Sequence, residues 1–243
     1  MRSARIFADL EVHPGQELLL PAAPSTHLLR VLRLRRGAAL TLFNGRGGEY
    51  AAELIGVDKS RALLRVGAHA ALERESPLQL TLLQGAARGE RMDFIVQKAT
   101  ELGVQRIVPL ACEFSVLRLD AASRQRRVEH WRAVAIAACE QCGRNRIPEI
   151  GPIGNLAEVC AGGGAELRLM LLPRAPESLA ALATGLRSAA LLVGPEGGLS
   201  DREQLLALHS GFRACRLGPR ILRTETAPLA ALATLQALAG DLA

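Results

Sequence analysis

Aromatic side chains are scarce in this chain of 243 residues, which contains one Trp, one Tyr and five Phe. Any sizeable core must therefore be aliphatic, and the high hydrophobic content, 49%, supplies enough Leu, Ala, Val and Ile for one. The sequence also lacks a run of about 18 uncharged apolar residues, so we expect no membrane-spanning helix. No apolar run follows the first residues, so we expect no signal peptide and a cytoplasmic protein.

Cysteines are few, and their number is odd. Cys139 and Cys142 have the CxxC spacing of metal and redox sites, but neither a second CxxC nor a His pair lies at ligand spacing. Five cysteines in a chain without a secretion signal argue against disulfides. We therefore expect no metal site and no disulfide.

Lysine is almost absent, since 28 of the 30 basic residues are Arg. The Arg side chain suits phosphate binding and base stacking, although a GC-rich genome would explain the larger share of this bias. The net charge is +6, and residues 1–70 carry ten basic against six acidic residues, whereas the remainder carries twenty against eighteen. This excess suits a polyanionic partner and is densest in the N-terminal third.

Residues 1–72 are predicted to form a small β-rich domain. Short strands are expected at residues 5–8, 17–20, 39–43, 49–54 and 61–66, with a glycine-rich hairpin loop at 44–48. A helix is expected from Thr26 to about Leu34, capped by Ser25 or Thr26. On this helix His27, Arg30 and Arg33 would form one stripe, which either contacts RNA phosphates or is an ordinary solvated face.

A polar link at residues 71–77 precedes a region in which strands and helices alternate. Strands are predicted at residues 78–83, 106–110, 167–172 and 213–217, and another strand is predicted to end at residue 193. Helices are predicted at residues 90–102, 120–141, 177–186, from 201 onwards, and 226–239, with a loop and a short helix within 151–164. This alternation predicts an α/β fold with a mostly parallel sheet covered on both faces.

Two strand–turn–helix connections near the C-terminus carry the strongest functional information. The first is Gly194-Pro195-Glu196-Gly197-Gly198, followed by a helix with Ser200 and Glu203 as a capping box. The second spans residues 217–227. Open α/β sheets bind ligands where strands end in such turns, so we expect the two connections to form one pocket. The alternative is that both are ordinary βα connections.

Several long motifs resemble the RsmE family of bacterial 16S rRNA uridine-N3 methyltransferases, which belong to the SPOUT class. The motifs are the two connections together with residues 27–33, 88–103 and 140–148, and the resemblance covers nearly the whole chain. It implies a PUA-like RNA-binding β-barrel at residues 1–72. It also implies a SPOUT domain at residues 73–243, with a C-terminal trefoil knot that binds S-adenosylmethionine and forms a homodimer. The implied reaction is methylation of N3 of a uridine in 16S rRNA of the 30S subunit.

The resemblance also implies site residues. The cofactor-binding residues would be Leu172, Pro173, Gly194, Pro195, Glu196, Gly197, Gly198, Leu217, Gly218, Ile221, Leu222, Thr224 and Ala227. Gly197 and Gly198 suit such a site because a Cβ would hinder close approach of the ligand to the backbone. Arg5, His27, Arg30 and Arg33 would contact RNA. Phe114 departs from the family, which usually has Arg before this Ser, and Arg118 is a candidate to compensate.

Methylation at uracil N3 sets the chemical requirements of the site. The base must be unpaired and N3 must lose its proton, which leaves negative charge on O2 and O4. A guanidinium would stabilise that charge, with Arg223 as the first candidate and Arg144 as the second. Glu225 or Glu140 would accept the proton. The alternative for Glu225, and also for Glu196, is that the carboxylate caps backbone amides in the turns.

Two other functions remain open at this point. A nucleotide-phosphate enzyme would use the Gly194–Gly198 turn to cradle a phosphate. The chain lacks GxGxxG and GxxxxGK[ST], however, and Pro195 removes one amide donor. A non-catalytic ribosome-binding or assembly factor would keep the fold without turnover, but both connections are intact, which argues against loss of a cofactor site.

Overall fold

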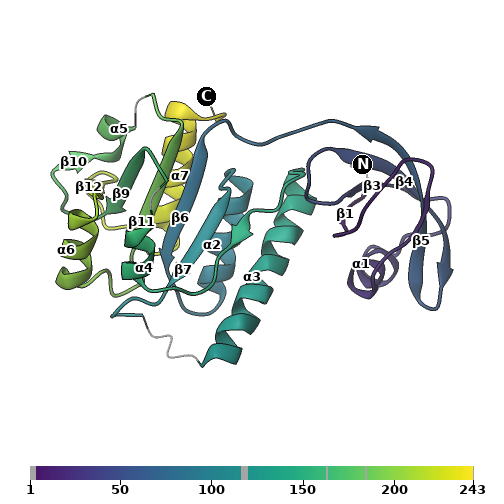
Figure 1. Ribbon diagram of the computed structural model, residues 1–243, viewed down its shortest axis with the longest axis horizontal. Helices are drawn as coiled ribbons and strands as arrows, with labels where there is room; N and C mark the ends of the chain where they lie inside the picture. The colour runs from purple at the N-terminus through teal and green to yellow at the C-terminus, as the bar shows by residue number, and fades with distance from the viewer. Residues whose placement is uncertain (1–3, 116–119, 163, 184, 243) are drawn as a thin grey trace. The chain divides into compact units, whose positions relative to one another are not determined.

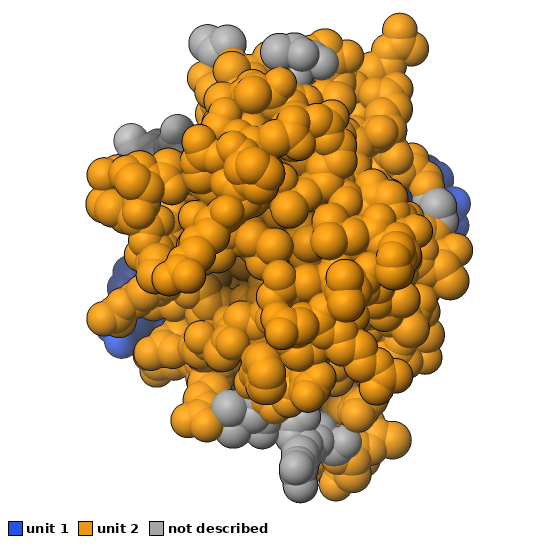
Figure 2. All heavy atoms as spheres, turned by 90° about the vertical axis from the view of Figure 1, so that its left-hand side faces the viewer, with its two compact units in different colours: residues 1–75, 139–147 blue, residues 76–138, 148–243 orange. Residues whose placement is uncertain are grey.

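The structure is a computed structural model that describes residues 4–115, 120–162, 164–183 and 185–242. It forms two compact units, which Figure 2 shows in different colours. Unit 1 contains residues 1–75 and 139–147, and unit 2 contains residues 76–138 and 148–243. The predicted boundary at residue 72 lies near the end of the first segment of unit 1. Nothing in the sequence pattern indicated that residues 139–147 belong with that unit.

Unit 1 is built on a five-stranded sheet with the order β1-β3-β4-β5-β2. Its strands are β1 (Ala4–Phe7), β2 (Glu17–Leu19), β3 (Ala39–Phe43), β4 (Glu49–Asp58) and β5 (Arg61–Ala70). β1 runs parallel to β3, and the other pairs are antiparallel. Alternate residues Ala62, Leu64 and Val66 of β5 face an aliphatic core, as the period of a half-buried strand requires. The five predicted strands and the hairpin loop are confirmed.

The helix predicted from Thr26 to Leu34 begins earlier and changes type. Helix α1 spans Ala22–Thr26 and continues into a π-helical turn, η1 (His27–Val31). The prediction was wrong because Pro24 is tolerated in the first turn of a helix, so it does not delay the start. Ser25 is buried, and its hydroxyl donates to the carbonyl of Leu20 and accepts from the amide of Ala62, so it does not cap. Thr26 makes no side-chain cap bond either.

The predicted basic stripe is therefore not one helical face. Arg33 follows the π-helical turn with a φ of 52°, outside the helix. The i,i+3 spacing of an α-helix does not apply to a turn closed by an i→i+5 bond, here from the amide of Leu32 to the carbonyl of His27. Arg30 and Arg33 are exposed and His27 is half-buried. Both arginines thus remain accessible to a polyanion, although not as a regular stripe.

Unit 2 contains a seven-stranded sheet with the order β10-β12-β9-β11-β6-β7-β8 (Figure 1). Every pair of neighbouring strands is parallel. The strands are β6 (Gln79–Gly85), β7 (Arg106–Leu110), β8 (Glu149–Ile150), β9 (Leu167–Leu171), β10 (Glu177–Ser178), β11 (Ser188–Val193) and β12 (Arg213–Arg216). The predicted parallel sheet is confirmed, although the two-residue strands β8 and β10 were not anticipated.

Helices cover both faces of this sheet. They are α2 (Glu90–Glu101), α3 (Ala121–Cys142), α4 (Leu156–Ala161), α5 (Leu179–Leu182), α6 (Asp201–His209) and α7 (Thr226–Ala239). Residues of α4 and α6 share a core cluster with Leu83, Met170 and Leu192. The alternate residues Leu82 and Leu191 are equally buried and point to the other face, where α7 contacts β6, β11 and α2.

The helix predicted at residues 177–186 is wrong in its first and last parts. Glu177 and Ser178 pair with β12 at the sheet edge instead, and Ser178 then caps the short helix α5. Gly185 has a left-handed φ of 66°, which lies outside helical geometry. The remaining predicted helices and the short helix near Leu156 are confirmed. No helix within the described ranges is long and apolar enough to span a membrane.

Candidate functional site

A cavity of about 520 Å³ opens in unit 2 at the carboxyl ends of β9, β11 and β12. Its lining comes mostly from three segments, at the end of β9 (within 171–173), at the end of β11 (within 193–199) and at the end of β12 (within 215–227). β9 lies between β11 and β12 in the sheet, so these three connections meet at one edge. The position and the volume are those of small-molecule sites in open α/β sheets.

Most of the predicted cofactor-binding residues line this cavity. They are Leu172, Pro173, Gly194, Pro195, Glu196, Gly198, Leu217, Ile221, Leu222, Thr224 and Ala227. Gly197 and Gly218 are not among its lining residues. A Cβ on Gly197 would lie 2.8 Å from the Cβ of Phe114, so the absence of a side chain here makes room for Phe114 and not for a ligand. Phe114 itself is about half exposed, and Arg118 lies outside the described residues.

The two predicted connections are joined by hydrogen bonds at the end of β6. The hydroxyl of Thr224 donates to the carbonyl of Gly194 at 2.9 Å, and the amide of Gln84 donates to that hydroxyl at 3.3 Å. A Cβ on Gly85 would lie 2.4 Å from the backbone nitrogen of Pro195, so only glycine allows β6 to approach the first connection this closely. The prediction that both connections contribute to one pocket is thus met by the geometry.

The capping box predicted after the first connection is present. The hydroxyl of Ser200 accepts from the amide of Glu203, and the carboxylate of Glu203 accepts from the amide of Ser200 at 2.9 Å. Within the turn, the amide of Gly198 donates to the carbonyl of Pro195, and Gly198 has a left-handed φ of 76°. The backbone on this side of the cavity is therefore fixed by local bonds.

Four arginines line the cavity, Arg91, Arg216, Arg220 and Arg223. Arg216 donates to the backbone carbonyls of Ala175 and Pro176, which holds the residues after β9 in place. No hydrogen bond or ion pair joins the exposed side chains of Arg220 and Arg223 to another described residue. Their charges are available to a ligand. Sequence reasoning selected Arg223 but missed the other three, of which Arg216 precedes the second connection and Arg220 lies within it.

The two carboxylates at the cavity behave differently. Oε1 of Glu196 accepts from the amide of Arg88 and from the guanidinium of Arg91, each at 3.0 Å. Burial opposes ionisation of Glu196, but these hydrogen bonds outweigh it and hold its pKa below the ordinary value. Glu196 thus accepts from a backbone amide, as its capping interpretation expects, but that amide belongs to Arg88 between β6 and α2 and not to either turn.

Glu225 precedes helix α7 at the N-cap position, yet its side chain makes no cap bond. The capping interpretation of Glu225 is therefore wrong. Its Oε2 is buried and has no hydrogen-bond partner, while Nε of Arg91 lies 3.9 Å away. A buried carboxylate oxygen without a partner is unusual in a folded protein, and here it belongs to a residue that lines the cavity.

Arg144 and Glu140 do not line the cavity and belong to unit 1. Arg144 is 4% exposed and donates to both carboxylate oxygens of Glu75, at 3.0 and 2.5 Å. Oε1 of Glu140 accepts from the amide of Phe7 at 3.0 Å, and burial raises the pKa of this carboxyl. Each residue holds part of unit 1 together, so this geometry does not favour either as a catalytic group.

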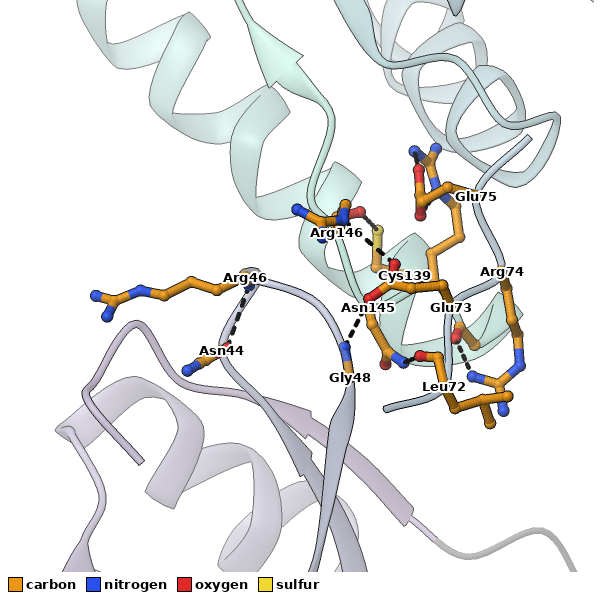
Figure 3. Close-up of polar contacts among 12 residues, drawn as sticks. Asn44, Arg46, Gly48, Leu72, Glu73, Arg74, Glu75, Cys139, Asn145 and Arg146 are labelled. Carbon is orange, nitrogen blue, oxygen red and sulfur yellow. Dashed lines mark hydrogen bonds and ion pairs between the residues drawn. The ribbon is translucent and has the colours of Figure 1, made fainter. Parts of the chain in front are cut away.

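Arg5 is also engaged within unit 1. Its guanidinium donates to Glu49 at 2.6 Å and to Asn145 at 2.7 Å, and only 13% of the side chain is exposed. Figure 3 shows the neighbouring contacts, in which Asn145 donates to the carbonyl of Leu72 at 2.6 Å. These bonds fasten residues 143–146 to the rest of unit 1. Arg5 is thus committed to the fold, which does not favour its predicted contact with RNA.

The structure does not favour a nucleophilic or metal-binding cysteine at this site. Cys215 contributes to the cavity, but burial raises the pKa of its thiol to about 12, so it is neutral and weakly nucleophilic near pH 7. Burial likewise raises the pKa of Cys139 to about 12. In the part of the chain that the structure describes, no group of three or more His, Cys, Asp or Glu side chains is placed to hold a metal ion.

Comparison with known proteins places this geometry in a family. The RNA methyltransferase domain family matches residues 74–236, and the RNA methyltransferase PUA domain family matches residues 24–67. Ribosomal RNA small subunit methyltransferase E of Buchnera aphidicola (from Schizaphis graminum) is 32% identical, over 99% of this chain and 98% of its own length. The corresponding protein of Bacillus subtilis is 29% identical, over 86% and 85% of the two chains.

Two solved structures resemble the whole chain. The methyltransferase Lpg2936 of Legionella pneumophila, in complex with the cofactor S-adenosylmethionine, has a TM-score of 0.95, 40% identity and full coverage of both chains. Ribosomal RNA small subunit methyltransferase E of Neisseria gonorrhoeae, bound to S-adenosylmethionine, has a TM-score of 0.95, 38% identity and the same coverage. With its parallel-sheet methyltransferase domain and its PUA domain, this chain belongs to the ribosomal RNA small subunit methyltransferase E family.

Proposed function

We propose that this chain uses S-adenosylmethionine to methylate N3 of a uridine in 16S rRNA of the small ribosomal subunit. The observation that carries the proposal is a cavity at the carboxyl edge of the unit 2 sheet, in which Arg223 has no partner among the described residues and Glu225 has a buried oxygen without a hydrogen bond. The names of the relatives and the cofactor in the two solved structures support it.

The cavity fits S-adenosylmethionine in size and in the groups that line it. Its volume of about 520 Å³ suits a ligand of that size. Leu172, Leu217 and Leu222 offer apolar surface for an adenine ring. When bound, the cofactor supplies an electrophilic methyl group.

The side chains of the cavity then have two tasks. Glu225 accepts the N3 proton at Oε2, the carboxylate oxygen that has no hydrogen-bond partner. Arg223 stabilises the negative charge that develops on O2 and O4 of the uracil. Arg220, which is exposed and also lines the cavity, is suited to an RNA phosphate near the entrance.

We also propose the finer architecture that accompanies this activity, a C-terminal trefoil knot and a homodimer. In support of the knot, the connection after β12 lines the same cavity as the loops after β9 and β11 and leads into α7, which contacts β6 and α2. Leu238 on α7 and Phe94 on the contacting helix α2 are 46% exposed each, which suits contact with a second copy. A cytoplasmic location would follow from the rRNA substrate.

Unit 1 is proposed to be a PUA-like β-barrel that positions the RNA. Arg30 and Arg33 are the residues that support this role, because both are exposed and lie in the region with the densest positive charge. His27 is half-buried next to them. Phosphate contacts of this kind would fix the register of the RNA and take no part in methyl transfer.

The proposed function is tested by methyl transfer to 30S subunits that lack the modification. The chain is incubated with the subunits and radiolabelled S-adenosylmethionine, and the 16S rRNA is digested to nucleosides and separated. We expect label in N3-methyluridine alone. Label at a ribose oxygen or at a carbon of the base would contradict the assigned reaction. Tight 30S binding without transfer would favour the non-catalytic factor.

A further inference from the structure

Arg91 bridges two carboxylates that reach it from different connections of the cavity. It lies in the first turn of α2, its side chain is 44% exposed, and it is one of the cavity-lining residues. One end of its guanidinium donates to Oε1 of Glu196 at 3.0 Å. Its Nε lies 3.9 Å from Oε2 of Glu225. One cation from the N-terminal half of unit 2 thus links the connection after β11 to the start of α7.

The two contacts differ in kind. Glu196 is fixed, because the same oxygen that binds Arg91 also accepts from the amide of Arg88. This hydrogen bond to the backbone anchors the carboxylate and therefore the guanidinium. The contact with Glu225 has ion-pair distance without hydrogen-bond geometry, so it attracts the carboxylate but leaves its lone pairs unoccupied.

We propose that Arg91 is a positioning residue, which attracts the carboxylate of Glu225 and fixes its place beside the cavity without occupying Oε2 by a hydrogen bond. This inference rests on the proposed function, in which Glu225 accepts the N3 proton of the uracil. Arg91 acts through Glu225 and touches neither the reacting atoms nor the cofactor.

A double-mutant cycle tests whether Arg91 acts through Glu225. The variants are Arg91→Ala, Glu225→Gln and the double variant, with Arg91→Lys as the conservative change. Arg88→Ala is the matched control, because it removes one exposed arginine three positions away while its backbone amide still binds Glu196. The single-turnover rate is measured with saturating S-adenosylmethionine and 30S subunits. The affinities for both ligands and the thermal midpoints are measured separately.

We expect Arg91→Ala to lower the methyl-transfer rate about tenfold in the wild-type background and less than about twofold in the Glu225→Gln background. Arg91→Lys should recover part of the rate, and Arg88→Ala should leave it unchanged. The affinities for S-adenosylmethionine and 30S subunits should stay within about twofold of wild type, because neither ligand contacts Arg91 in this account.

Two results would overturn the inference while leaving the proposed function intact. Equal losses of rate in both backgrounds would show that Arg91 acts independently of Glu225. A weaker affinity for either ligand, with an unchanged rate at saturation, would show that Arg91 binds that ligand directly. A wild-type chain that transfers no methyl group at all would instead remove the proposed function, and this inference with it.

Discussion

Arg144 and Arg223 both belong to motifs that resemble the RsmE family, yet the structure uses them in opposite ways. Arg144 is 4% exposed and makes a two-point contact with Glu75 in unit 1. Arg223 is exposed at the cavity of unit 2 and has no partner among the described residues. An arginine thus stabilises the fold in unit 1, whereas in unit 2 the charge of an arginine is available to a ligand.

The difference follows from what surrounds each guanidinium. A buried arginine must be paired, because a lone charge away from water costs several kcal/mol, and a bidentate carboxylate meets that need. Once paired, it cannot respond to the charge that develops on a substrate. An exposed arginine in a turn needs no partner for folding, so its full charge remains for a ligand. The unit 1 contact should therefore govern stability, and the unit 2 residue should govern turnover.

The largest expected effect is that of Arg223→Ala on turnover. Loss of a charge-stabilising donor typically lowers the rate by about 100- to 1,000-fold. The rate at saturating S-adenosylmethionine and 30S subunits should fall by this amount, while the thermal midpoint and the cofactor affinity stay at wild-type values. Arg202→Ala, which removes another exposed arginine of unit 2, is the matched control. A rate within a few fold of wild type would show that Arg223 is not catalytic.

Arg144→Ala should produce the converse result. The substitution leaves Glu75 without the guanidinium of Arg144. Because Glu75 is 17% exposed, we expect the free energy of unfolding to fall by about 2–3 kcal/mol, which is at or below the smallest losses typical of a broken buried ion pair. Denaturant titration measures this loss. Methyl transfer per folded molecule, assayed well below the midpoint, should be unchanged. A stable Arg144→Ala variant with a strongly reduced rate would reverse the comparison.

A smaller effect is expected for the double variant Arg30→Ala, Arg33→Ala. If both residues contact phosphates, each lost contact should reduce the slope of log affinity against log salt by about 0.7–0.9. The affinity for 30S subunits should therefore fall and become less dependent on salt, while the affinity for S-adenosylmethionine does not change. An unchanged salt slope would assign both arginines to an ordinary solvated surface.

The smallest effect concerns Glu140, whose pKa burial raises above its ordinary value of 4.5. The folded chain then holds the proton to a higher pH than the unfolded chain, so wild-type stability is reduced as pH rises from 4.5 through the raised pKa. Glu140→Gln cannot titrate and should lack this reduction, so its thermal midpoint should approach or exceed that of wild type near pH 7. Full turnover of the variant would confirm a structural role, whereas a large loss of turnover would make Glu140 catalytic.

Local sequence patterns predicted the fold well where strand periodicity, capping residues and turn residues all indicated the same element. The parallel strands that end at Val193 and near Leu217, and the Ser200–Glu203 capping box, followed from such patterns. Helix α1 did not, because Pro24 and the burial of Ser25 outweighed the expected cap. The first part of the helix expected at 177–186 was lost for a similar reason, since pairing of Glu177 and Ser178 with β12 outweighed helix propensity.

The site was predicted in outline, because both connections could be identified from glycine and capping residues. The partners of the charged side chains could not be identified from the sequence, because they come from distant segments. Arg144 finds Glu75, and Glu225 faces Arg91, across separations that no local pattern encodes. Gly197 illustrates the same limit, because its turn was recognised while its contact with Phe114 was not.

Calorimetry tests most directly whether the cavity of unit 2 is the S-adenosylmethionine site. S-adenosylmethionine, ATP and NAD are each titrated into wild type, into Ala227→Leu and into Ala133→Leu. Ala227 lines the cavity from the first turn of α7, so a larger side chain occupies ligand space without changing the backbone, whereas Ala133 is exposed on α3. We predict that only S-adenosylmethionine binds and that Ala227→Leu alone weakens it, by about tenfold or more. Comparable binding of ATP or NAD, or undiminished S-adenosylmethionine affinity in Ala227→Leu, would contradict this account.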